Sequence, residues 1–565
     1  MIEKKKKISI GVEDFKTIID KNGYFVDKTL LIRDIIESNT LVSLFTRPRR
    51  FGKTLNQFMI RRFFEDERTE QGEKIENGYL FDGLAISSCV EEILKHRQQY
   101  PVIFVSMKSG RQPSYEMAYA CLLDEICKEF TRHRYVLDSE LITLADKKRY
   151  ENLMNREAAE AEYAKAFAFL SECLSKYHGR KVFILIDEYD VPLENAHFQG
   201  FYDEMTGFIR SLFESALKTN PYLEKGIITG CLRISKESIF TGLNNLRVYS
   251  LISNQYCDKF GFTPEEVMHM LEYYGLGEYY PILHEWYDGY KFGTAEIYNP
   301  WSILCYMEDA LSGNFQPRPY WSNTSSNSII RELVEGADDE TRKDLETLMD
   351  GSTIEKPIHE DITYGDIYRS QDNLWNFLFF TGYLKAIKEQ PEGNQIYLEM
   401  SIPNLEIASV YENSISYWFD KKMERTDKSA LIRALERGDC EAAEDFINRQ
   451  LMDTISYFDY AESYYHGFMT GLLKGSGKYI VQSNRESGDG RPDIVLKTAN
   501  VRKGRVIILE FKIASRVADM ESKCTDAAEQ IEKKRYAEPF LSEGYPEIDK
   551  YAVCFCRKDC IVRKV

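Results

Sequence analysis

Residues 41–54 read LVSLFTRPRRFGKT, an apolar run followed by a basic turn that ends in Gly52, Lys53 and Thr54. The run predicts a buried strand, and the amphipathic pattern of residues 55–65 predicts a helix directly after the turn. Strand, Gly-Lys-Thr and helix follow one another in the order of a P-loop, which binds phosphate through backbone N–H groups and a helix N-terminus. Arg47 occupies the place of the first glycine of that motif. On these residues alone, a basic turn before a helix is the alternative.

A second apolar run, residues 182–186 (VFILI), ends in Asp187 and Glu188. In a P-loop protein, an acid at this strand end binds Mg²⁺ together with the Thr54 hydroxyl. The next acid, Glu188, is then placed to polarise the attacking water, and Lys53 to reach the β- and γ-phosphates. The alternative is a buried strand followed by a solvated acidic turn. Together the two motifs predict a site for ATP and Mg²⁺.

A third apolar run, residues 226–230 (GIITG), leads into a polar segment. Thr229 is placed to sense the γ-phosphate, and Arg233 is a candidate to stabilise charge on the transferring phosphoryl group. A surface ion pair is the alternative for Arg233. The residues predicted to bind the nucleotide are Arg49, Arg50, Phe51, Gly52, Lys53, Thr54, Asp187 and Thr229.

Near the C-terminus, Asp493 leads into one apolar run, and Glu510 and Lys512 end another, residues 506–512 (VIILEFK). Residues two apart in a strand point to the same face, so Glu510 and Lys512 project together and Phe511 turns into the core. If the two runs pair as a hairpin, Asp493 joins them. Two carboxylates and an ammonium at one place are costly unless a cation or an anionic substrate balances them. A metal-dependent phosphodiester hydrolase needs this arrangement.

In such a site, Asp493 and Glu510 are predicted to bind Mg²⁺ or Mn²⁺, because oxygen ligands suit these hard cations. A water acidified by the metal is the expected nucleophile. Lys512 is expected to position this water or to stabilise the negative charge of the transition state. The alternative is an ion pair at a strand end of a scaffold domain.

The charge of the chain is unevenly distributed. The net charge of −17 argues at first against a nucleic-acid partner. Residues 461–565, however, contain 19 Lys and Arg against 15 Asp and Glu, so the segment with the predicted nuclease site is basic and suited to phosphate contact. No apolar run is long enough for a membrane span, and no signal-peptide pattern is present. We therefore expect a cytoplasmic protein without a membrane partner.

The alternation of short apolar runs with helical patterns indicates an α/β fold. Runs at 41–45, 101–105, 181–186 and 226–230, with amphipathic stretches at 115–135 and 157–177 between them, predict a parallel sheet covered by helices. Residues 372–388 predict an apolar helix that turns into a strand. We predict three domains: a P-loop (RecA/AAA-like) ATPase domain at 1–260, a mostly helical lid or linker domain at 261–402, and a restriction-endonuclease-like α/β core at 403–565.

Several strings resemble the bacterial AAA-ATPase-like family. They are residues 23–29 (GYFVDKT), 47–54 (RPRRFGKT), 229–240 (TGCLRISKESIF), 286–290 (WYDGY) and 299–302 (NPWS). Members commonly carry the arginine-rich loop without the first glycine. The family usually ends in a PD-(D/E)XK nuclease-like domain, which residues 465–469 (YHGFM) and 483–493 (SNRESGDGRPD) resemble. The resemblance implies an ATPase fused to a nuclease, with phage defence or mobile elements as the usual biological setting.

The resemblance also implies further site residues. In related nucleases an acid from the helix before the hairpin assists the metal, and Glu462 is the candidate; a capping or exposed carboxylate is the alternative. A Gln and a Lys from a later helix often face the site, and Gln530 and Lys534 are the candidates; a charged solvent face is the alternative.

Three hypotheses of function remain at this point. The first is an ATP-regulated, metal-dependent nuclease that cuts nucleic acid, with DNA favoured. The second is a nucleotide-dependent switch or scaffold whose nuclease-like domain binds nucleic acid or partners without cutting. The third is a stand-alone ATPase whose tail only assembles oligomers. Formation of a homo-oligomer is left open.

Overall fold

The computed structural model describes residues 5–232, 239–240, 244–321, 330, 333, 338–358, 370–393, 395–425, 429–452, 462–473, 478–483 and 490–565. The chain divides into two compact units. The first unit consists of Met1–Ser325 and Thr353–Ser409, and the second of Ser326–Ser352 and Val410–Val565. Among the described residues, no helix is long and apolar enough to cross a membrane.

The first unit contains a five-stranded parallel sheet with the order β2-β3-β4-β1-β5. The strands are β1 (Val42–Thr46), β2 (Val102–Ser106), β3 (Val182–Asp187), β4 (Leu223–Gly230) and β5 (Leu246–Tyr249). The four strands predicted from apolar runs are confirmed; β5 was not predicted, because its four residues include a charged one and form no apolar run. Since β4 lies between β1 and β3, the carboxyl ends of these three strands meet at one edge of the sheet.

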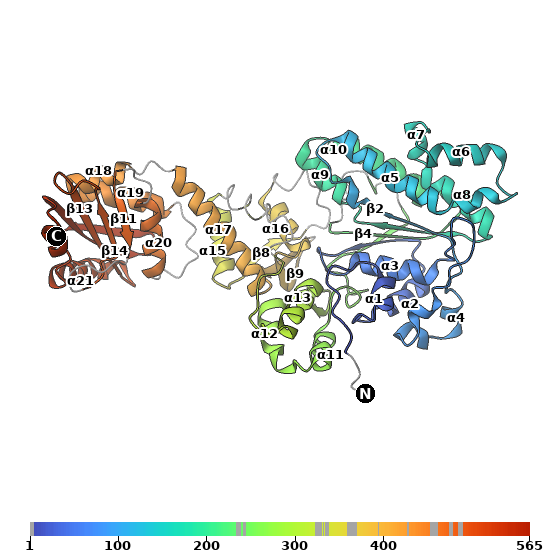
Figure 1. Ribbon diagram of the computed structural model, residues 1–565, viewed down its shortest axis with the longest axis horizontal. Helices are drawn as coiled ribbons and strands as arrows, with labels where there is room; N and C mark the ends of the chain where they lie inside the picture. The colour runs from blue at the N-terminus through green and yellow to red at the C-terminus, as the bar shows by residue number, and fades with distance from the viewer. Residues whose placement is uncertain are drawn as a thin grey trace. The chain divides into compact units, whose positions relative to one another are not determined.

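Helices cover both faces of this sheet (Figure 1). One side carries α1 (Phe15–Asp20), α2 (Leu30–Glu37), α3 (Lys53–Phe64) and α4 (Glu91–Leu94), and the other side carries α5 (Tyr115–Arg132), α8 (Ala166–His178), α9 (Val191–Gln199) and α10 (Tyr202–Phe213). The predicted helix at 115–135 is α5. The pattern at 157–177 forms two helices, α7 (Glu160–Tyr163) and α8, and α6 (Leu144–Met154) precedes them. Both faces of the strands are therefore covered, as their continuous apolar sequences require.

The segment after the parallel sheet is mainly helical and carries two small antiparallel sheets. Its helices are α11 (Pro264–Tyr274), α12 (Tyr280–Tyr287), α13 (Pro300–Leu311) and α16 (Gln371–Phe380). One sheet is the hairpin of β6 (Tyr290–Phe292) and β7 (Ala295–Ile297), and the other has the order β8-β10-β9, with β8 (Ile354–Pro357), β9 (Lys385–Glu392) and β10 (Gln395–Ser401). The predicted change from helix to strand within 372–388 is confirmed by α16 and β9.

The second unit contains a five-stranded mixed sheet with the order β11-β12-β13-β14-β15. Its strands are β11 (Ile480–Ser483), β12 (Ile494–Lys497), β13 (Arg505–Ile513), β14 (Glu547–Cys556) and β15 (Asp559–Lys564). Strands β13 and β14 run parallel, and the other neighbours are antiparallel. The expected hairpin is present, because β12 pairs with β13 with Ile494 opposite Leu509.

The helices of the second unit precede the sheet or connect its strands. They are α15 (Asp339–Met349), α18 (Ser429–Arg437), α19 (Cys440–Met452), α20 (Glu462–Leu473), α21 (Met520–Lys533) and α22 (Glu538–Glu543). Helix α17 (Leu405–Arg425) begins in the first unit, and its residues from Val410 on belong to the second. The crossover between the parallel strands β13 and β14 is formed by α21 and α22, as a parallel pair requires.

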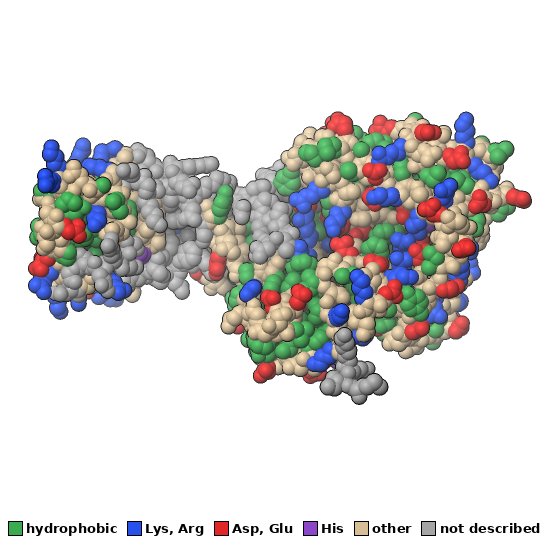
Figure 2. Space-filling view, viewed as in Figure 1, with side chains coloured by type: hydrophobic (Ala, Val, Ile, Leu, Met, Phe, Trp, Pro, Cys, Tyr) green, Lys and Arg blue, Asp and Glu red, His purple; other side chains and the backbone are tan. Residues whose placement is uncertain are grey.

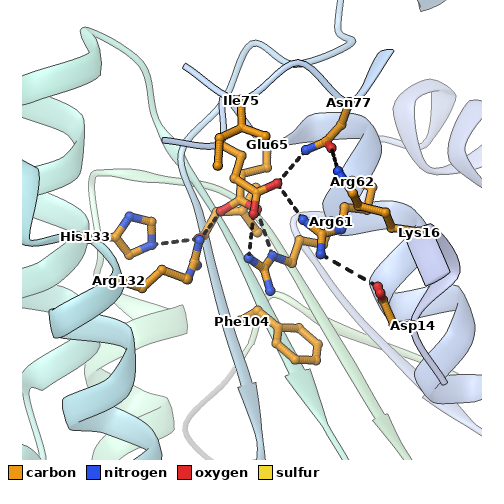
Figure 3. Close-up of polar contacts among 12 residues, drawn as sticks. Asp14, Lys16, Arg61, Arg62, Glu65, Ile75, Asn77, Phe104, Arg132 and His133 are labelled. Carbon is orange, nitrogen blue, oxygen red and sulfur yellow. Dashed lines mark hydrogen bonds and ion pairs between the residues drawn. The ribbon is translucent and has the colours of Figure 1, made fainter. Parts of the chain in front are cut away.

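A buried network of charges fixes the C-terminal end of α3 (Figure 3). Glu65 is 2% exposed and accepts a hydrogen bond from Arg61 Nε at 2.7 Å. It also pairs with Arg132 of α5, which in turn contacts Glu129 Oε2 at 2.7 Å. Burial alone raises the pKa of Glu65, but the charges of Arg132 and Arg61 outweigh this effect and lower it to about 2. The network therefore ties α3 to the opposite layer of helices.

Replacing Arg132 by Met leaves Glu65 and Glu129 buried without their shared cation. We expect R132M to lower the free energy of unfolding of the first unit by about 3–5 kcal/mol, measured by urea denaturation followed by circular dichroism. R134M is the matched control, because Arg134 pairs with Glu70 at 3.6 Å while both side chains are half exposed, so its cost should stay within about 0.5 kcal/mol. Equal, small losses in the two variants would contradict the structural role of the network.

Candidate functional site

The basic turn after β1 forms a loop over the N-terminus of α3. Gly52 caps the helix with a φ of 80°, a conformation that favours glycine, and Arg50 also has a positive φ, of 72°. Lys53 is buried, and its Nζ donates to the carbonyl oxygens of Arg47 and Pro48, both at 2.9 Å. The lysine predicted to bind phosphate thus lies folded back over its own loop.

Asp187 connects the ends of three elements at this edge of the sheet. Thr54 Oγ1, at the start of α3, donates to Asp187 Oδ2 at 2.8 Å. Thr229 Oγ1, at the end of β4, donates to Asp187 Oδ1. Burial raises the pKa of Asp187, and the hydrogen bond from Thr229 opposes the rise. A hydroxyl and a carboxylate oxygen in contact are donors that suit Mg²⁺, so the residues present fit this ion.

A cavity of about 420 Å³ lies over the loop, a size within the range of small-molecule sites. The predicted residues that line it are Arg49, Arg50, Phe51, Gly52, Lys53, Thr54 and Glu188. Lys108 and Arg111, which follow β2, also line it and were not predicted. Their position after the carboxyl end of a parallel strand was the available signal. The remaining walls of the cavity are largely apolar and include Tyr24, Phe262 and Trp301.

Arg47, the residue in place of the motif's first glycine, points into the core. It is fully buried, and its guanidinium donates to the carbonyl oxygens of Tyr249 at 2.8 Å and Tyr256 at 3.3 Å. It also lies 5.2 Å from the ring centroids of Phe260 and Phe292. Burial lowers the pKa of Arg47 to about 9. This arginine therefore braces the loop against β5 and the segment after it.

Two other loop residues are held by protein partners. Arg49 forms an ion pair with Glu194 of α9. The Phe51 ring is fully buried and contacts Tyr290 and Phe292, at centroid distances of 5.0 and 5.1 Å. The side chain of Phe51 is thus part of the core, although the residue borders the cavity.

Asp190 organises the chain after β4 and was not predicted. Its Oδ2 accepts hydrogen bonds from the backbone N–H groups of Cys231 at 2.7 Å and Leu232 at 3.1 Å. The Tyr189 hydroxyl donates to the Leu232 carbonyl at 2.6 Å. Asp190 stands three residues after Asp187, but its partners lie 41 and 42 residues away, which the sequence does not reveal. Arg233, which follows these partners, lies outside the described residues.

Asp493, Glu510 and Lys512 lie together at the ends of β12 and β13. Lys512 Nζ is 3.5 Å from Glu510 Oε1, and Asp493 Oδ2 accepts a hydrogen bond from the Phe511 backbone N–H at 2.7 Å. Both carboxylates are buried, and so is the Phe511 ring. Burial and the negative charge of Asp493 raise the pKa of Glu510 to about 7, although Lys512 opposes the rise.

Gln530 joins this cluster, because its Nε2 donates to Glu510 Oε1 and lies 3.2 Å from the hydroxyl of Tyr536. Tyr536 was not predicted to be part of the site. His466 lies on α20 with its Nε2 3.0 Å from the carbonyl oxygen of Asp493, so it supports the backbone there. Glu462 begins α20, but its side chain lies outside the described residues.

The two carboxylates fit a divalent cation. Glu510 Oε2 is buried and has no hydrogen-bond partner among the described residues, and the neighbouring Asp493 carboxylate destabilises its charge. Positive charge offsets both costs, and oxygen donors suit Mg²⁺ or Mn²⁺. Within the described part of the chain, no group of three or more His, Cys, Asp or Glu could hold a metal. Mg²⁺ commonly binds through one or two carboxylates and keeps several waters.

The two segments that contain the candidate sites each match a family of known proteins. Residues 9–240 match the family described as Predicted AAA-ATPase, and residues 460–565 match the PD-(D/E)XK nuclease superfamily. The chain therefore carries an AAA-ATPase-like domain, with a domain of the PD-(D/E)XK nuclease superfamily at its C-terminus. A protein of Azotobacter chroococcum mcd 1, described as an uncharacterized protein in the vnfD 5' region, is 24% identical over 558 residues, which cover 96% of this chain and 95% of the relative.

Because Arg47 braces the loop, restoring the glycine of the usual motif at this position is expected to destabilise the fold. R47G restores the usual glycine, but it removes the donors of three carbonyls, those of Thr46, Tyr249 and Tyr256, and opens a cavity. We expect it to destabilise the first unit by about 3 kcal/mol or more, measured by urea denaturation. R47K keeps the charge with fewer donors and should lose less. A stable R47G variant that binds ATP more tightly would contradict the structural role of Arg47.

Substitution of either carboxylate, Asp493 or Glu510, is expected to weaken metal binding. D493N and E510Q should each weaken Mn²⁺ binding to the nucleotide-free chain by about tenfold or more, because each removes a charged ligand. Titration calorimetry measures the affinity. E529Q is the matched control, because Glu529 lies exposed on α21 beside Gln530. Unchanged Mn²⁺ affinity in both D493N and E510Q would show that the metal does not bind at this site.

Proposed function

We propose that this chain binds and hydrolyses ATP in the cavity over its P-loop, and that its C-terminal domain cleaves nucleic-acid phosphodiesters with Mg²⁺ or Mn²⁺. The observation that carries the proposal is the buried pair Asp493 and Glu510 with Lys512 beside it. Two carboxylates whose like charges oppose each other are costly in a merely structural role. The cost is offset when a cation and a phosphate occupy the site.

The proposed roles at the nucleotide site follow from the contacts there. Lys53 exchanges the carbonyls of its own loop for phosphate oxygens, and Thr54 and Asp187 hold Mg²⁺. The ion, when bound, neutralises charge on the phosphates. Glu188 has a φ of 52° and lines the cavity, so it is placed to orient the attacking water. Thr229, bonded to Asp187, reports on the occupancy of this site.

The proposed roles at the nuclease site rest on the same kind of argument. Asp493 and Glu510 hold the metal, which supplies an acidified water when bound. Lys512 places a positive charge where negative charge develops on the phosphate. Gln530 orients the Glu510 carboxylate through its hydrogen bond. Glu462 is kept as a candidate acid from α20, and Arg233 as a candidate cation in the ATPase domain.

The proposed partner is nucleic acid, with DNA favoured. Residues 461–565 carry more Lys and Arg than Asp and Glu, and Figure 2 shows blue side chains of Lys and Arg prominent on the described surface of the second unit. Phosphate contact is favoured by such a surface. A cytoplasmic location and formation of a homo-oligomer are further proposals. On the family resemblance, we place the protein in phage defence or mobile-element biology.

Separate variants test the two activities of the full chain. D493A and K512A should abolish metal-dependent cleavage of a panel of DNA and RNA substrates while ATP hydrolysis remains, because the two sites share no residues. K53A should reduce ATP hydrolysis by at least about a hundredfold. K533A is the control for K512A, because Lys533 lies exposed at the end of α21.

Retained cleavage in D493A and K512A would refute the nuclease assignment. Nucleotide binding by a wild-type chain that cuts no nucleic acid with either metal would favour the switch or scaffold instead.

A further inference from the structure

Arg50 of the P-loop stacks on Trp301, a residue from the first turn of α13. The Arg50 guanidinium carbon lies 3.9 Å from the centroid of the indole ring, and both residues line the cavity over the loop. A cation over an aromatic face contributes about 0.5–2 kcal/mol. This contact therefore favours one position of the Arg50 side chain. Its energy is small enough for nearby phosphates to alter that position.

The backbone that carries Trp301 is held in place by the capped start of its helix. The Asn299 side chain caps α13 by accepting a hydrogen bond from the Trp301 backbone N–H at 2.9 Å, and Pro300 occupies the first turn. The next residue, Ser302, is fully buried and donates its hydroxyl to Glu406 Oε2 at 2.7 Å. The helix start that carries Trp301 is thus bonded directly to Glu406.

Glu406 is a fully buried carboxylate in the first turn of α17. Its second oxygen accepts a hydrogen bond from the Trp321 backbone N–H at 2.8 Å. Burial raises the pKa of Glu406 to about 7, and the bonds from Ser302 and Trp321 and the positive charge of Arg50 oppose the rise. The positive charge of Arg50 therefore favours the ionised form of Glu406.

Helix α17 is a single element of 21 residues, about 30 Å long at the usual rise of a helix. Its first residues belong to the nucleotide-binding unit, and those from Val410 on belong to the unit with the nuclease-like domain. A change at its first turn is therefore a change at the start of a helix whose residues are divided between the two units.

We propose that Trp301 positions Arg50 for contact with the phosphates of the nucleotide, and that the bond from Ser302 to Glu406 passes a change in this contact on to α17. The inference rests on the proposed nucleotide site. Phosphates attract the Arg50 guanidinium, so nucleotide binding changes both its stacking on Trp301 and the positive charge near Glu406. Trp301 is a positioning residue, because it acts through Arg50.

A direct contact between Trp301 and the nucleotide base is the competing account, since Trp301 also borders the apolar wall with Phe262 and Leu304. A double-mutant cycle on the full chain separates the two accounts. Affinities for ATP and for adenosine are measured by titration calorimetry for R50Q, W301L and the double variant.

We expect R50Q and W301L each to weaken ATP binding by about five- to tenfold, the range of one cation–π or charged contact. The double variant should bind ATP no more weakly than R50Q, because Trp301 has no other route to the phosphates. Adenosine affinity should not change, and W301F should restore ATP binding. F169L is the matched control, because the Phe169 ring lies under Arg149 at 4.2 Å and does not line the cavity.

Additive losses in the double variant, or weaker adenosine binding by W301L, would overturn the positioning role and favour the base contact. A wild-type chain that does not bind ATP would refute the proposed function instead, so the two failures are distinguishable.

Hydrogen exchange of α17, with and without a non-hydrolysable ATP analogue, tests the second step. The exchange of its first turns should change with the analogue in the wild type and in F169L, and should not change in W301L or E406Q. If α17 of the wild type exchanges identically with and without saturating analogue, the proposal that nucleotide binding changes this helix is refuted.

Discussion

A carboxylate loses several kcal/mol of hydration when it is buried. Both units of this chain nevertheless bury carboxylates, near the C-terminal end of α3 in the first unit and at the candidate metal site in the second. The cost is met in different ways. Glu65 and Glu129 share Arg132, and the opposing charges lower the pKa of both acids in spite of burial. Glu510 lies beside another carboxylate, and its pKa rises to about 7. The balance of nearby charges thus decides whether the pKa of a buried acid falls, as at Glu65, or rises, as at Glu510.

The pKa alone does not separate a candidate ligand from a supporting group at the proposed nucleotide site. Asp187 is buried among hydroxyl donors, and burial raises its pKa more than the hydrogen bonds from Thr229 and Thr54 and the charge of Lys53 lower it. Asp190 is met by backbone N–H groups, and its pKa is also raised. Asp187 borders the place where Mg²⁺ is expected, whereas Asp190 holds the segment after β4. A raised pKa therefore marks both a candidate ligand and its support, and only the geometry distinguishes them.

Local pattern was sufficient for much of the fold and for the pairing of Asp493 with Glu510. Apolar runs marked four strands of the parallel sheet, and the two-residue period placed Glu510 and Lys512 on one side of β13. The role of Arg47 was beyond such reasoning, because Tyr249 and Tyr256, whose carbonyls it binds, lie more than 200 residues away. The bond between Ser302 and Glu406 spans 104 residues, and neither residue belongs to a motif with a known chemistry.

The arginines of the loop differ in how far they can respond to a nucleotide. Arg47 is locked by buried carbonyls, so its displacement would expose unsatisfied polar groups. Arg49 and Arg50 line the cavity and are held from outside the loop, by Glu194 of α9 and by Trp301 of α13. Phosphates of the proposed nucleotide must compete with Glu194 for Arg49, whereas the stacking on Trp301 holds Arg50 at the cavity. Binding energy that goes into changing these contacts would not tighten affinity, and a ligand changes a conformation only when it interacts differently with the two states.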